Sequence, residues 1–124
     1  MPTNATRPAL VPQTIVSTML DGSVHFSCES GGEPLAVCVW ERDITGRPEM
    51  LVIDGEVKEK SGHISNDISV FGGGLEEGKC GIRIHSAKED DLGLWLCSLV
   101  TTGSHQVFSG KVDVRLEKRN CSRV

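Results

Sequence analysis

The chain has 124 residues, with 17 acidic side chains against 13 basic ones. This length suits one domain with short tails. The acidic balance argues against a nucleic-acid partner, because phosphate-backbone binding needs a clustered basic face. Aromatic residues make up only 4% and tyrosine is absent, so we expect a core of aliphatic side chains, disulfides and the two tryptophans.

Short segments in which apolar and polar residues alternate, separated by Gly, Pro and Asp-Gly turns, predict β-strands along most of the chain. One helical turn is expected at 88–92. This spacing is typical of an all-β antiparallel sandwich. We assign residues 14–117 to the domain, 1–13 to an N-terminal tail and 118–124 to a C-terminal tail or linker. In chain order the expected strands are 14–20, 23–29, 36–41, 50–53, 56–58, 64–70, 80–85, 94–99 and 106–116.

The five cysteines are scattered and include no Cys-x-x-Cys pair, so zinc-ribbon spacing is absent and we expect no metal. Scattered thiols in an intracellular protein are one interpretation. The other, which we favour, is an extracellular disulfide-bonded domain. Asn4 and Asn120 each begin an Asn-x-Ser/Thr triplet and are candidate glycosylation sites, which agrees with that location.

Cys28, Trp40 and Cys97 together resemble the pattern of an immunoglobulin domain. The resemblance implies an immunoglobulin-like sandwich of the variable (V) type. In that fold the two cysteines bridge the two sheets and the tryptophan packs on the bridge. Such a bridge would close most of the chain into a loop, which is worth roughly 4 kcal/mol in the chain-entropy model.

Asp91 and Gly93 resemble the corner that leads into the strand of the second cysteine. Immunoglobulin domains usually have tyrosine two residues before that cysteine, and here the position is Trp95. An indole can donate one hydrogen bond but has no hydroxyl group. We therefore expect packing and Gly93 to hold this corner.

Cys38 lies two residues before Trp40 and shares its inward face, and Cys80 alternates with apolar residues on its own strand. In an immunoglobulin fold these two strands belong to opposite sheets. The two thiols are either a second inter-sheet disulfide or two separate buried side chains. Cys121 lies beyond the last strand without an assigned partner.

The segment from Phe71 to Val114 resembles the first domain of fasciclin III and related arthropod cell-adhesion receptors. The residues that carry this resemblance are Phe-Gly-x-Gly-Leu from Phe71, Gly-x-Cys-Gly around Cys80 and Cys-Ser-Leu from Cys97. It covers roughly residues 14–116, and Cys38 has a counterpart in it, which implies a Cys38–Cys80 bridge. The resemblance implies an extracellular adhesion protein that binds itself or a related immunoglobulin-superfamily receptor, without catalysis.

Gly73 to Lys79 reads Gly-x-x-x-x-Gly-Lys, the phosphate loop of nucleotide-binding enzymes. Cys80 replaces the Ser or Thr that would hold magnesium, Glu76 and Glu77 would face the phosphates, and a strand follows where a helix is needed. We interpret the segment as a turn before a strand. With no Gly-x-Ser-x-Gly motif and four dispersed histidines, we expect no catalytic residue, cofactor or small-molecule substrate.

Alternation around the inward Cys38, Trp40, Trp95 and Cys97 turns their apolar neighbours outward, onto strands that are adjacent in the immunoglobulin fold. A contiguous apolar patch usually marks an interface, so we expect a protein partner there, including a homodimer, unless loop 42–48 or another domain covers it. The alternative is recognition of a foreign ligand through loops 30–35, 42–48 and 100–106, which lack Tyr and Trp. The expected patch is Val37, Val39, Met50, Val52, Leu94 and Leu96.

Overall fold

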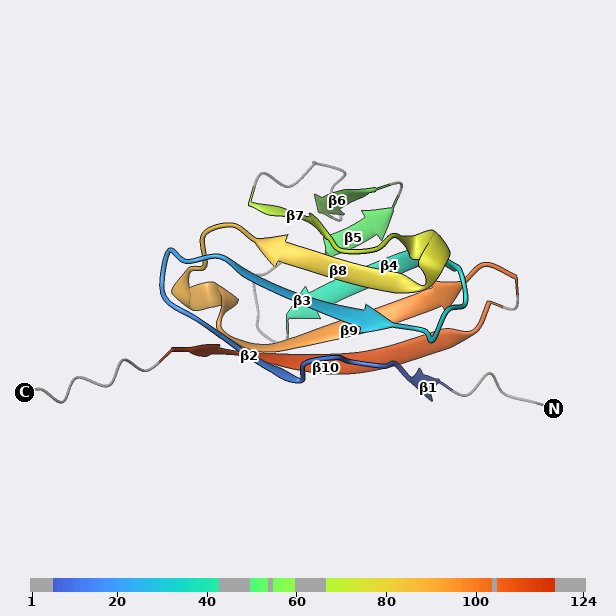
Figure 1. Ribbon diagram of the computed structural model, residues 1–124, viewed down its shortest axis with the longest axis horizontal. Helices are drawn as coiled ribbons and strands as arrows, with labels where there is room; N and C mark the ends of the chain where they lie inside the picture. Colours follow the sequence, from blue (N-terminus) through green and yellow to red (C-terminus); the bar gives the residue numbers. More distant parts are fainter. Residues whose placement is uncertain (1–5, 43–49, 54, 60–66, 104, 118–124) are drawn as a thin grey trace, which may run out of the picture.

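The computed structural model describes residues 6–42, 50–53, 55–59, 67–103 and 105–117, which form two β-sheets packed face to face (Figure 1). The larger sheet has seven strands in the order β1–β10–β9–β4–β5–β6, with β2 also paired to β10. The smaller sheet has the order β3–β8–β7. The protein is therefore an all-β sandwich, as expected.

The elements agree closely with the expected segments, and the helical turn expected at 88–92 is present. A second short helical turn was not expected. The strands are β1 (Arg7–Pro8), β2 (Ile15–Thr18), β3 (Val24–Glu29), β4 (Leu35–Arg42), β5 (Met50–Ile53), β6 (Glu56–Glu59), β7 (Ile68–Phe71), β8 (Lys79–Ile84), β9 (Gly93–Thr101) and β10 (Val107–Leu116). The 3-10 turns are η1 (Leu75–Glu77) and η2 (Glu89–Asp91).

Residues 7–11 belong to the sandwich, so the expected N-terminal tail of 1–13 is wrong in this part. β1 pairs in parallel with β10, and Leu10 exchanges backbone hydrogen bonds with Glu29 on β3. Val11 packs against the core. Pro8 lies on an edge strand, where a missing N–H is tolerated.

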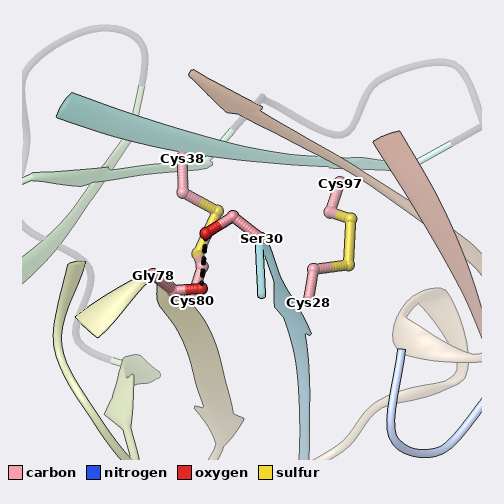
Figure 2. Close-up of a disulfide and its surroundings, with 6 residues drawn as sticks. All are labelled: Cys28, Ser30, Cys38, Gly78, Cys80 and Cys97. Atoms are coloured by element: carbon pink, nitrogen blue, oxygen red, sulfur yellow. Dashed lines mark hydrogen bonds between the residues drawn. A yellow bond between two sulfur atoms is a disulfide. The ribbon is translucent and has the colours of Figure 1, made fainter. Parts of the chain in front are cut away.

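Two disulfides cross the core side by side, as Figure 2 shows. Cys28 on β3 is bonded to Cys97 on β9, and Cys38 on β4 to Cys80 on β8. Cys28 and Cys80 lie directly opposite each other on neighbouring strands of the smaller sheet. Each bridge joins one sheet to the other, so the second disulfide implied by the family resemblance is present in the structure.

Trp40 lies in the core between the sheets, fully buried and directly opposite Cys97 in the β4–β9 ladder. The ring of Phe26, from the smaller sheet, meets it edge-on with centroids 5.0 Å apart. Such edge-to-face pairs add about 0.5–1.5 kcal/mol to the burial of the rings. Trp40 thus packs beside the Cys28–Cys97 bridge, as expected.

Trp95 holds the corner before β9 by a hydrogen bond that the sequence did not lead us to expect. Its indole Nε1 donates to the carbonyl oxygen of Asp91 at 2.9 Å. Arg42 lies over the indole ring, 5.2 Å from its centroid, and donates from Nη2 to the carbonyl oxygen of Leu92 at 2.5 Å. Gly93 adopts φ 110°, which favours glycine. The corner is therefore held by a side-chain hydrogen bond as well as by packing.

The segment from Gly73 to Lys79 forms η1 and then enters β8, as expected of a turn before a strand. Gly78 has φ 76°, and a Cβ there would collide with the carbonyl oxygen of Glu33 and the hydroxyl of Ser30. Figure 2 shows that hydroxyl directed at the Gly78 carbonyl oxygen, at 3.4 Å. The glycine is thus required by the close approach of the two loops beside the Cys38–Cys80 bridge.

Replacing both Cys38 and Cys80 by alanine should lower the free energy of unfolding by roughly 2–4 kcal/mol, because the bridge restrains a long loop of the unfolded chain. Denaturant unfolding of the oxidised wild type and the double variant measures the difference. An unchanged midpoint would contradict a stabilising role for this bridge.

Trp95→Phe should lower the free energy of unfolding by about 1–3 kcal/mol, because the buried hydrogen bond from the indole to the Asp91 carbonyl oxygen is lost. Trp95→Tyr is the matched control, since its hydroxyl supplies a donor at the end of a ring. Thermal or chemical unfolding should rank the variants wild type, Tyr, Phe. Equal losses in both variants would show that the hydrogen bond does not stabilise the corner.

Candidate protein-binding face

The two faces of β4 differ sharply, because successive side chains of a strand point to opposite sides of the sheet. Cys38 and Trp40 are fully buried between the sheets. Val37 and Val39 lie on the outer side and are partly exposed. Both valines are therefore where the sequence led us to expect them.

β9 and β10 continue this outer surface. Leu94 and Leu96 on β9 are partly exposed, as expected, while Trp95 between them is buried. Val100 and Val107 add two more partly exposed aliphatic side chains that sequence reasoning missed. Extending the alternation of β9 beyond Leu96 and Ser98 would have found Val100.

The outer side chains of the three strands align in rows, because the ladders pair β4 with β9 and β9 with β10. We call this surface the β4–β9–β10 face. Leu94 lies beyond the rows, opposite Asp113 on β10. From β4 through β9 to β10, the rows are Val37–Val100–Val107, Val39–Ser98–Ser109 and Glu41–Leu96–Lys111.

Met50 and Val52 do not belong to this face, and their expected place in the patch was wrong. They pair directly with Trp40 and Cys38 in the β4–β5 ladder, and opposite residues share one side of a sheet. Met50 is 4% exposed and Val52 1%, both within the core. The register of β5 against β4 decides on which side of the sheet these two side chains lie. Alternation within β5 does not determine that register.

The face has a shallow hollow of about 350 Å³ over β9 and β10, bordered by Glu41, Leu96 and Lys111. The small residues Ser98, Ser109 and Gly110 also line it. Gly110 lies beneath, where a Cβ would come within 3.2 and 3.3 Å of the two sulfurs of the Cys28–Cys97 bridge and 2.8 Å of Val11. The face therefore combines aliphatic side chains, a depression and the charges of Glu41 and Lys111, and the Asp113–Arg115 ion pair follows Lys111 on the same side of β10.

The outer side of the smaller sheet is more polar. His25 stacks on Phe71 with ring centroids 3.8 Å apart, and Ser69 contacts His85 Nε2 at 2.9 Å. Arg83 donates from Nε to the hydroxyl of Ser23. Within the described ranges, no group of three or more His, Cys, Asp or Glu side chains is arranged to hold a metal ion.

Asp21 and Lys88 shift each other's pKa, and they lie in the connections after β2 and β8. Their ion pair is 2.5 Å long. The hydrogen bond from Lys88 lowers the pKa of Asp21, and the same contact raises the pKa of Lys88. Both side chains are well exposed, so solvent screens the pair.

Asn4, Asn120, Cys121 and the loop 43–49 lie outside the described residues, as does the tail 118–124. Of the loops expected as an alternative recognition surface, 30–35 is described throughout, and Gly31 to Pro34 are exposed. No helix in the described part of the chain is long and apolar enough to cross a membrane.

No family model matches the sequence, and no curated protein matches it either. Among solved structures, one similar chain belongs to the structure that reports the structural basis of T cell specificity and activation by the bacterial superantigen toxic shock syndrome toxin-1. The TM-score is 0.66 with 14% sequence identity, and the match covers 88% of this chain and 99% of that one. At this identity the likeness shows a shared fold alone.

Proposed function

We propose that the protein is a V-type immunoglobulin-like domain that serves as the extracellular recognition module of a cell-adhesion protein. It binds a second copy of itself or a related receptor through the β4–β9–β10 face. The single observation that carries the proposal is the row of partly exposed aliphatic side chains across three adjacent strands.

The strand order supports the V-type assignment. The sheet of β10, β9 and β4 continues into a further hairpin, β5–β6, and β2 runs parallel to β10 at its edge. The added hairpin beside these three strands distinguishes the variable type from the constant type. The Cys28–Cys97 bridge with Trp40 packed beside it, and Trp95 in the place of the corner tyrosine, agree with the same fold.

The chemistry of the face favours protein binding. Aliphatic side chains on neighbouring strands present one surface whose burial is favourable, at roughly 25 cal/mol per Å² removed from water. Contiguous apolar patches on soluble domains mark interfaces more often than scattered single residues do. Two disulfides in so small a domain support an oxidising, extracellular location.

Val39→Glu and Leu96→Arg should each abolish self-association, because a partner would have to bury an unpaired charge. A cost of the order of 3 kcal/mol corresponds to about a hundredfold weaker binding. Sedimentation velocity over a concentration series measures the effect, and circular dichroism checks the fold. Glu76→Arg on η1, away from this face, is the matched control and should associate like the wild type.

Unchanged association in both face variants would contradict the proposal. Binding to a ligand that survives both variants, but is lost when loops 30–35 and 100–106 are exchanged, would instead favour a domain that recognises a foreign ligand through its loops.

A further inference from the structure

We infer that a second copy of this chain packs on the β4–β9–β10 face about a twofold axis parallel to β9, so that Glu41 of each copy meets Lys111 of the other. The inference rests on the proposed function and adds its geometry. It follows from the way charge, size and polarity are distributed along the three rows of the face.

The charged row carries Glu41 on β4, Leu96 on β9 and Lys111 on β10. Strands lie about 4.8 Å apart, so β4 and β10 are roughly 10 Å apart. A twofold axis in the plane of the interface and parallel to β9 exchanges the positions of β4 and β10. It therefore forms two equivalent Glu41–Lys111 pairs, each between one copy and the other. The two Leu96 side chains meet between these pairs.

The row Val39–Ser98–Ser109 fits the same operation by size. The axis sets Val39 of one copy over Ser109 of the other, at the edge of the hollow of about 350 Å³. The large side chain of β4 then faces the small side chain of β10, so the hollow receives an aliphatic group from the partner. This match of shape is what a well-packed interface requires.

The row Val37–Val100–Val107 is apolar throughout, so it is compatible with its own image under the same axis. Val37 meets Val107 of the other copy, and the two Val100 side chains meet each other. All three rows are therefore complementary to themselves under a single operation, which is the condition for a closed, isologous dimer.

A twofold axis perpendicular to the strands, through the charged row, gives the opposite result. It leaves each strand over its own image, so that Glu41 faces Glu41 and Lys111 faces Lys111. Like charges placed together in an interface are unfavourable. The charge pattern thus selects the axis parallel to β9 over this alternative.

Glu41→Lys and Lys111→Glu test the inference by sedimentation velocity. Each single variant places two like-charge pairs in its own dimer and should self-associate at least about tenfold more weakly than the wild type. An equimolar mixture of the two single variants should associate again, because one copy then presents two positive charges and the other two negative charges. The double variant E41K/K111E should also recover self-association. Arg83→Glu, the same kind of charge reversal on the other sheet, should leave association unchanged.

The twofold arrangement would be overturned if neither the mixture nor the double variant recovered association while Leu96→Arg still abolished it. The face itself would then remain the interface. Single reversals that associate like the wild type would overturn the arrangement in the same way. A wild-type protein that stays monomeric across the concentration series would overturn both the arrangement and the proposed self-association.

Discussion

Cys28–Cys97 and Cys38–Cys80 each join a strand of the larger sheet to a strand of the smaller one, and the rest of the molecule depends on this pair of links. A disulfide across the core determines which side chains of its strand face inward, because a shift by one residue would turn the cysteine outward. β4 and β9 are the two central strands of the larger sheet, and each is held in this way. Their outer side chains are therefore determined by the same links that stabilise the core.

The proposed interface is a consequence of this arrangement. Alternation away from the bridged cysteines brings Val37, Val39, Leu94 and Leu96 to one surface, while the tryptophans on the same two strands point into the core. Small residues have a second role here. Gly110 leaves room for the sulfurs of one bridge, and it lines the hollow on the face together with Ser98 and Ser109. The packing of the core and the shape of the outer surface are thus linked through the same strands.

The sequence predicted the sandwich, the strand positions and the inward faces well, because alternation and cysteine positions are local signals. It failed where the answer depended on pairing between segments. Met50 and Val52 alternate in a way that is compatible with either face, and only their register against β4 turns them inward. Residues 7–11 looked like a tail because their edge pairing with β10 and β3 leaves little trace in composition. The Trp95 hydrogen bond required the geometry of the corner, which residue chemistry alone does not supply.

Covalent footprinting tests most directly whether the disulfide-linked strands present an interface. It compares two protein concentrations, one low enough to keep the chain monomeric and one high enough for association. We expect labelling at high concentration to fall at Val37, Val39 and Leu96, and to stay constant at His25 and Arg83 on the other sheet. Protection confined to the smaller sheet or to the loops at the ends of the sandwich would contradict this expectation.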